Sequence, residues 1–225
     1  MKIAIIGAGN VGRSLASNAA RAGHEVVISD RDPEEAAELA GSVHGTPTGD
    51  PKQAVAQAEI VVLAVPFASV EELARTIAGG IAGKVVVDAT NPLKPTYDGL
   101  TTEGGPSGAE RIQSWLPGAK VVKAFNTIFA AKQADPVVDG EPVDALIAAD
   151  DQNARDKVIA LAGSMGFRPV DAGVLARAKE LEAMAFLIIS LQVSKRGDWQ
   201  SAWKLAHAPA AAVRQAAGAA AQASR

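Results

Sequence analysis

Short apolar runs alternate with amphipathic stretches along the first 175 residues. The runs are rich in Val and Ile, a composition typical of strands that are buried on both faces of a parallel sheet. They predict about eight strands, at residues 2–6, 25–29, 43–45, 59–65, 84–88, 120–124, 143–148 and 168–171. Several stretches between them carry apolar residues at helical spacing, as at Val70, Leu73 and Ile77. The pattern predicts an α/β fold with a doubly wound, mainly parallel sheet of the Rossmann type.

A glycine-rich turn follows the first predicted strand, and a helix begins directly after it. In this context the first glycine allows a tight turn, the second lets a pyrophosphate approach the backbone, and the third lets the helix pack on the strand. The motif therefore predicts a dinucleotide-binding site; the alternative is a glycine turn that binds no ligand. The residues of this turn are Gly7, Ala8, Gly9, Asn10, Val11 and Gly12.

Further candidate residues stand where other predicted strands end, because ligands of open α/β sheets bind outside the carboxyl ends of the strands. Pro66 and Phe67 can present an apolar face to a nicotinamide ring, and Asn and Thr side chains can hydrogen-bond a carboxamide or a ribose. The alternative for Asn126 and Thr127 is a turn or a helix cap. These strand-end residues are Asp30 and Arg31, then Val65, Pro66 and Phe67, then Asn91 and Pro92, and finally Asn126 and Thr127.

The alternation of predicted strands and helices is interrupted in two places. Residues 90–106 form a loop too long for a simple connection, and such loops are usually functional or mobile. Beyond Gly173 the pattern predicts only helix, so we expect a dinucleotide-binding domain at residues 1–175, a helical extension at 176–207 and an alanine-rich tail at 208–225. The helix around Leu181 to Leu191 is apolar nearly all round. It can be a core helix, a pocket wall or a subunit interface, and we expect a homodimer.

Composition and charge exclude several classes of protein. The formal net charge is −3 and aromatic residues make up 4% of the chain, so we expect no nucleic-acid partner. The chain has no cysteine, and its three histidines lack metal-binding neighbours in the sequence, so we expect no metal site. The apolar run at the N-terminus is too short for a signal peptide, and the apolar C-terminal helix is too short to span a bilayer. We therefore expect a cytoplasmic protein without a membrane segment.

Several of these segments together resemble the coenzyme F420-dependent NADP reductases, and the cytoplasmic domains of the STEAP-type metalloreductases are similar. The segments that carry the resemblance are residues 3–12, 22–25, 32–34, 62–67, 88–92, 122–127 and 181–182. The resemblance implies an NAD(P)-dependent oxidoreductase that transfers hydride between a nicotinamide dinucleotide and the deazaflavin F420 or a flavin-like partner. It also implies a partner pocket at Asn126, Thr127 and Ile128, near the 90–106 loop and the helix after Ala178. It assigns no catalytic side chain, because the cofactors supply the reacting atoms.

The predicted ribose site departs from the pattern of that family. Members that prefer NADP carry a hydroxyl residue, an arginine and a further basic residue four positions later, where this chain has Asp30, Arg31 and Glu35. A carboxylate accepts hydrogen bonds from a free ribose 2′-hydroxyl, but repels a 2′-phosphate by roughly 1 to 3 kcal/mol at about 5 Å. We therefore expect NAD to be favoured; NADP is the alternative if Glu35 points to solvent and Arg31 alone decides.

Two other functions fit the same motifs. A non-catalytic NAD(P) sensor would keep the dinucleotide site and fill the space beside the nicotinamide. An imine or pyrroline reductase would need a proton donor in that space, for which Tyr97, Lys94 and Lys123 are the candidates.

Overall fold

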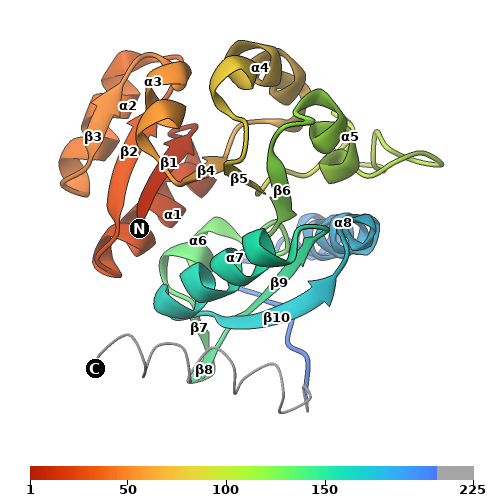
Figure 1. The fold of residues 1–225 in the computed structure, drawn as a ribbon. Helices are drawn as coiled ribbons and strands as arrows, with labels where there is room; N and C mark the ends of the chain where they lie inside the picture. Colours follow the sequence, from red (N-terminus) through yellow and green to blue (C-terminus); the bar gives the residue numbers. More distant parts are fainter. Residues whose placement is uncertain (207–225) are drawn as a thin grey trace.

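The protein forms one eight-stranded sheet with helices on both faces, shown in Figure 1. The structure, a computed structural model, describes residues 1–206; the predicted tail and His207 lie outside the described residues. The sheet strands are β1 Lys2–Ile6, β2 Glu25–Ser29, β3 Thr46–Thr48, β4 Ile60–Leu63, β5 Val85–Asp88, β6 Lys120–Lys123, β9 Asp144–Ala149 and β10 Arg168–Gly173. The helices are α1 Asn10–Arg21, α2 Pro33–Ser42, α3 Pro51–Gln57, α4 Val70–Ile77, α5 Gly108–Trp115, α6 Ala130–Ala134, α7 Gln152–Ser164 and α8 Ala178–Lys195.

The strand order confirms the predicted doubly wound sheet. It runs β3-β2-β1-β4-β5-β6-β9-β10, and all neighbours are parallel except β6 and β9. The first six strands of this order follow the Rossmann arrangement, in which the chain reverses direction across the sheet between β1 and β4. A crevice opens at such a switch point, next to the turn that follows β1.

Strand alternation divides the core between two faces of the sheet. Ile3 and Ile5 of β1 pack in the cluster that includes residues of α1, α2 and α7, whereas Ala4 and Ile6 pack in the cluster that includes residues of α3, α4 and α5. Because every second side chain of a strand points to the same face, an uninterrupted apolar run supplies both clusters. This explains why the strands lack an apolar and polar alternation of their own.

Three local predictions were wrong. The third strand begins at Thr46 and not at residue 43, because α2 continues to Ser42 and Val43 is its C-cap. The short helix α6 and the hairpin of β7 Val137–Val138 and β8 Glu141–Pro142 were missed, since all three are too short to show a period. Within the predicted helical extension, helix ends at Lys195, and residues 196–206 are not helical.

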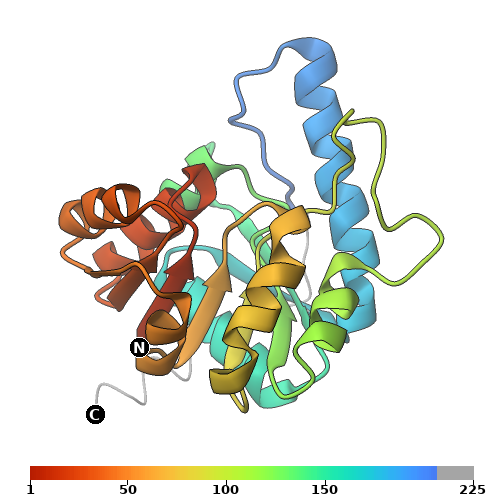
Figure 2. The ribbon, with the colours of Figure 1, turned by 90° about the horizontal axis from the view of Figure 1, so that it is seen from above.

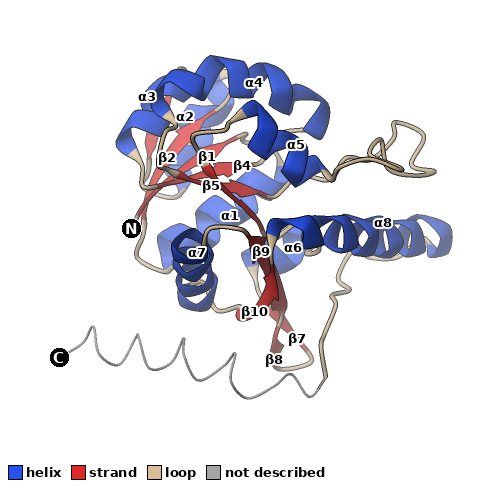
Figure 3. Ribbon diagram, turned by 45° about the vertical axis from the view of Figure 1, so that its right-hand side comes forward, coloured by secondary structure: helices blue, strands red, loops and turns tan. Residues whose placement is uncertain are grey.

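The helix α8 is buried on one side only. Leu181, Ala185 and Ile188 are buried, whereas Leu187 and Leu191 are 49% and 40% exposed. Figures 2 and 3 show α8 and the 92–106 loop extending from the same side of the molecule. Among residues 1–206, no helix is both long enough and apolar enough to cross a membrane.

Candidate functional site

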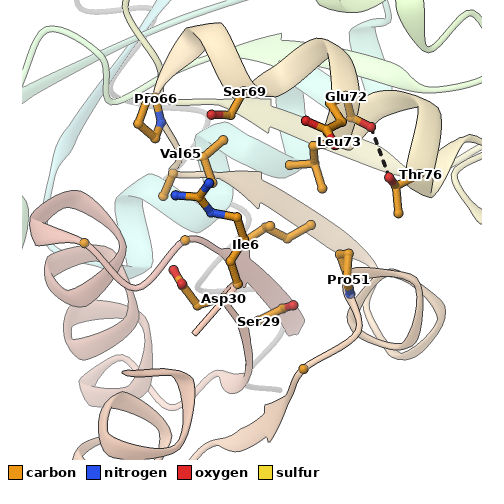
Figure 4. Close-up of a pocket in the computed structure, with 15 residues that line it drawn as sticks. Ile6, Ser29, Asp30, Pro51, Val65, Pro66, Ser69, Glu72, Leu73 and Thr76 are labelled. Atoms are coloured by element: carbon orange, nitrogen blue, oxygen red, sulfur yellow. Dashed lines mark hydrogen bonds between the residues drawn. The ribbon is translucent and has the colours of Figure 1, made fainter. Parts of the chain in front are cut away.

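A cleft of about 480 Å³ lies at the switch point of the sheet. This volume is in the range of small-molecule and cofactor sites. The end of β1, the end of β2 and the residues after β4 form one part of its wall, and α4 forms another (Figure 4). The lining residues are Ile6, Gly7, Gly9, Ser29, Asp30, Arg31, Gly49, Pro51, Ala64, Val65, Pro66, Ser69, Glu72, Leu73 and Thr76.

The three glycines of the turn differ in what surrounds them. A Cβ on Gly12 would overlap the carbonyl oxygen of Gly7, and a Cβ on Gly7 would lie 2.7 Å from the carbonyl carbon of Ala64. Gly7 also has φ of +112°, which side-chain-bearing residues rarely adopt. A Cβ on Gly9, in contrast, would have no atom within 4 Å, and Gly9 lines the cleft. The turn is therefore packed where strand and helix meet, and open where a pyrophosphate would lie, so it fits a dinucleotide.

Asp30 lines the cleft at the end of β2. Its carboxylate accepts hydrogen bonds from the backbone N–H of Ala8 at 2.7 Å and of Asp32 at 3.0 Å. These bonds join the glycine turn to the start of α2 and hold the carboxylate at the cleft wall. Arg31 follows it and is exposed. The structure thus brings both predicted ribose residues to the cleft.

Glu35 does not line this cleft. It forms an ion pair with Arg13 of α1, which also pairs with Glu38 at 3.1 Å. The hydrogen bonds that Arg13 donates to Glu38 and to Glu35, in that order of effect, raise the pKa of Arg13. Sequence reasoning missed Arg13, because nothing in the local pattern shows that α1 and α2 face each other here. Sequence reasoning also missed the cleft-lining residues of α4, which are Glu72, Leu73 and Thr76. The helical spacing of Val70, Leu73 and Ile77 predicts the helix but not which side faces the cleft.

The other predicted site residues gather at the far end of the strand edge. Asn91 donates from Nδ2 to the backbone carbonyl of Asn126 at 2.9 Å, and Asn126 donates to Asn91 Oδ1 at 3.0 Å. Asn126 also donates to the carbonyl of Leu181 in α8 at 3.1 Å. Its own Oδ1 is buried and has no hydrogen-bond partner in the described part of the chain. Thr127 and Ile128 are 3% and 5% exposed, so both side chains are buried beneath the segment that follows β6.

Phe67 begins the short 3-10 helix Phe67–Ser69 that follows β4. Its ring lies 5.9 Å from the ring of Trp115 in α5. Phe67 and Pro92 do not line the cleft, whereas Val65 and Pro66 do. The structure therefore divides the predicted residues into two sets. The first belongs to the cleft: Gly7, Gly9, Asp30, Arg31, Val65 and Pro66 line it, and Ala8, Asn10, Val11 and Gly12 belong to the same turn without lining it. The second follows β4, β5 and β6 outside the cleft lining, and comprises Phe67, Asn91, Pro92, Asn126, Thr127 and Ile128.

Comparisons with known proteins agree with this geometry. Residues 2–92 match the family model described as NADP oxidoreductase, coenzyme F420-dependent. The F420-dependent NADP reductase of Methanothermobacter marburgensis is 33% identical over 212 residues, which cover 87% of this chain and 94% of that protein. The chain belongs to this family. Membership makes it an oxidoreductase of an NADP-dependent family and confirms the resemblance seen in the sequence.

Two further relatives show how far the likeness extends. Rat metalloreductase STEAP3 is 35% identical over 189 residues, but the match covers 84% of this chain and only 37% of the metalloreductase. A crystal structure of a candidate F420-dependent NADP reductase from Arthrobacter sp. FB24 superposes with a TM-score of 0.79 at 31% identity, and covers 88% of this chain and 96% of that one. An imine reductase from Myxococcus stipitatus superposes with a TM-score of 0.67 at 17% identity, which shows a shared fold alone.

The structure also places the candidate proton donors of an imine reductase. Tyr97 is 58% exposed within the 92–106 loop, and Lys94 pairs with Glu103 at 3.1 Å in the same loop. Lys123 is completely buried, and its ammonium group donates to Asp88 and to the backbone carbonyl of Thr90. None of the three side chains lines the cleft.

Proposed function

We propose that this family member transfers hydride between a nicotinamide dinucleotide and the deazaflavin F420. The observation that carries the proposal is the cleft at the switch point, open at Gly9, in a chain that matches two F420-dependent NADP reductases over nearly their full length. When bound, the nicotinamide and the deazaflavin supply the reacting carbon atoms. The protein binds the two cofactors, aligns them and excludes water.

The test is a comparison of acceptors. Oxidation of NADH and of NADPH is followed at the nicotinamide absorbance band, with F420, FMN and FAD offered separately. We expect turnover with F420 that exceeds turnover with either flavin, and a lower kcat/KM for the dinucleotide in Gly9→Ala. Turnover with a flavin and not with F420 would replace the proposed partner. Tight dinucleotide binding without turnover on any acceptor would favour the sensor.

We further propose that NAD(H) is preferred over NADP(H). Asp30 supports this preference, because its carboxylate is held at the cleft wall and a 2′-phosphate would approach it. Arg13 is already paired with Glu35 and Glu38. Arg31 is therefore the cation among the cleft-lining residues that can interact with a 2′-phosphate. Repulsion of roughly 1 to 3 kcal/mol at about 5 Å outweighs one exposed arginine, whose ion pairs in water contribute about 1 kcal/mol or less.

The variant Asp30→Ser tests the preference, with Asp32→Ser as its matched control. Asp32 caps α2 by accepting from the N–H of Glu34, and serine can make the same cap. We expect Asp30→Ser to raise the ratio of kcat/KM for NADPH to that for NADH by about tenfold or more. Asp32→Ser should leave the ratio unchanged. An unchanged ratio in Asp30→Ser would show that Asp30 does not select the dinucleotide.

We also propose that two copies of the chain associate through α8. Its exposed side carries Leu187 and Leu191, which stand at positions i and i+4 of one helix face and are 49% and 40% exposed. Large apolar side chains on one exposed helix face give an apolar strip, and such strips mark association surfaces. A second copy of the same helix would cover it.

A further inference from the structure

A buried ion cluster lies beneath the second set of predicted site residues. Lys123 and Asp88 are 0% exposed and Glu182 is 1% exposed. The ammonium group of Lys123 lies 2.8 Å from Asp88 Oδ2 and 3.1 Å from Glu182 Oε1, and it donates to the carbonyl of Thr90 at 2.7 Å. The three charged residues come from β6, β5 and α8. We call Asp88, Lys123 and Glu182 the buried triad.

Glu182 links the triad to α5 and to Phe67. Its carboxylate accepts from the backbone N–H of Gly108 at 3.0 Å and of Ala109 at 3.3 Å, in the first turn of α5. A Cβ on Gly108 would lie 3.0 Å from Glu182 Oε1 and 2.9 Å from Cε2 of Phe67. The glycine thus allows α8, α5 and the Phe67 ring to meet at one point. A shift of Glu182 would move the support behind that ring.

Asp88 and the start of α8 link the same triad to the two asparagines. Asp88 Oδ1 accepts from the backbone N–H of Thr90 at 2.9 Å and from its hydroxyl at 2.7 Å, and Asn91 is the next residue. Asn126 stands three residues after Lys123 and donates to the carbonyl of Leu181, the neighbour of Glu182. Phe67, Asn91 and Asn126 therefore all rest on elements that the triad joins.

The chemistry of the triad argues for a role in geometry. Two carboxylates and one ammonium group carry a formal charge of −1 into the core, and the surrounding N–H groups and the N-terminus of α5 offset it. Buried ion pairs are often no more stabilising than well-packed apolar residues, and in some proteins they instead fix the relative positions of the elements that carry them. The cluster also joins four separate elements, which a single apolar contact would not orient.

We propose that Asp88, Lys123 and Glu182 are positioning residues for the reacting ends of the two cofactors. This role rests on the proposed hydride transfer. The triad aligns the nicotinamide ring, and the cleft around Asp30 provides the affinity for the adenosine half. A misplacement of about 1 Å in such a site can lower the rate about a hundredfold. None of the three triad residues lines the cleft.

The variant Glu182→Gln removes one charge and keeps the shape of the side chain. We expect kcat to fall by about tenfold or more, while the Kd of NADP(H) and NAD(H), measured by fluorescence titration, changes by about twofold or less. The emission of the bound nicotinamide should shift, and hydrogen exchange should rise at residues 124–128 and 178–186. Lys123→Met leaves two buried carboxylates unpaired and should show the same pattern more strongly; if it does not fold, Asp88→Asn replaces it.

Asp144→Asn is the matched control. Asp144 is 2% exposed at the start of β9, and it accepts hydrogen bonds from Arg168 and from the backbone N–H of Leu205, neither of which is a predicted site residue. We expect it to lower the melting temperature without changing kcat or nicotinamide emission at temperatures below the transition. The proposal is overturned if Glu182→Gln lowers only the melting temperature, or if both variants change kcat equally.

The two proposals fail in different ways. If the wild type does not reduce F420 but Glu182→Gln still shifts the emission of bound nicotinamide and the hydrogen exchange of residues 124–128, the triad positions the dinucleotide and the F420 assignment is wrong. If the wild type turns over F420 and Glu182→Gln does so at the same rate, the proposed function stands and the positioning role is wrong.

Discussion

Alanine at Gly9 and alanine at Gly12 should separate binding from folding. The two glycines are three positions apart in one turn, yet a methyl group meets open cleft at Gly9 and backbone at Gly12. We expect Gly9→Ala to weaken dinucleotide binding at nearly constant stability. We expect Gly12→Ala to destabilise the whole domain.

The magnitudes follow from the local geometry. Gly9 is the N-cap of α1 with φ of −71° and ψ of −173°, which alanine can adopt. Gly9→Ala restricts the unfolded chain and thereby adds about 0.4 to 1 kcal/mol to the free energy of unfolding. Alanine is a poor N-cap residue, and this removes a similar amount. At Gly12, the gain in helix propensity is about 1 kcal/mol, and overpacking costs about 1 to 3 kcal/mol or more. Collision with a backbone carbonyl places Gly12→Ala at the upper end of that cost, because a backbone atom cannot rotate away.

Thermal unfolding and titration with NADH and NADPH measure the two effects. The melting temperature of Gly9→Ala should stay within about 3 °C of the wild type, and that of Gly12→Ala should fall by about 5 °C or more. A methyl group at the pyrophosphate costs about 1 to 3 kcal/mol, so the Kd of Gly9→Ala should rise about 5-fold to 150-fold. Wild-type affinity in Gly9→Ala would refute the assignment of the glycine turn to the pyrophosphate.

Three further predictions concern other parts of the molecule. Leu187→Glu should convert the expected dimer to a monomer in light scattering after size exclusion, whereas Val137→Glu, at a similarly exposed apolar residue on β7, should not; a wild type that is already monomeric contradicts the α8 interface. Burial, and then the charge of the N-terminus, lower the pKa of His24, so the folded protein binds its proton less readily than the unfolded chain. Stability is therefore lost as the pH falls below the unfolded pKa of about 6.5, and His24→Gln should melt with a weaker dependence on pH between about 5.5 and 8. Ser107→Ala removes the capping box of α5 and should lower stability by about 1 kcal/mol, read as a fall in melting temperature of about 2 to 4 °C.

The cleft half of the site could be predicted because its determinants are local. The strand, the glycine turn and the first turn of α1 are consecutive, and each residue type has a direct steric or hydrogen-bonding reason. Asp30 could be placed because it ends the next strand in sequence, which is also the next strand in space. The remaining features of the cleft depend on tertiary contacts: Arg13 forms an ion pair with Glu35, and residues of α4 line the cleft. The periodicity and spacing of residues along the chain do not show which helices contact each other.

Lys123 shows most clearly where sequence reasoning stops. The sequence offered Lys123 as a candidate proton donor for an imine reductase, because no partner for it can be placed along the chain. The structure instead shows a lysine without exposed surface, whose neighbours come from positions 88, 90 and 182. A charge is stable there only because carboxylates from two other elements arrive at the same point, and that coincidence cannot be seen along the chain.

The two halves of the site therefore differ in how they are encoded. Dinucleotide binding is specified within the first thirty or so residues, so many sequences can share it and still differ in reaction. The proposed reacting end comprises Phe67, Asn91, Asn126 and Glu182, which the chain brings together across more than a hundred positions. Substitutions at these positions alter alignment without altering the glycine motif, so the choice of hydride acceptor is expected to depend on them and on α8. Exchange of the α8 segment for that of a relative with another acceptor should then move acceptor preference while the preference between NADH and NADPH stays with Asp30.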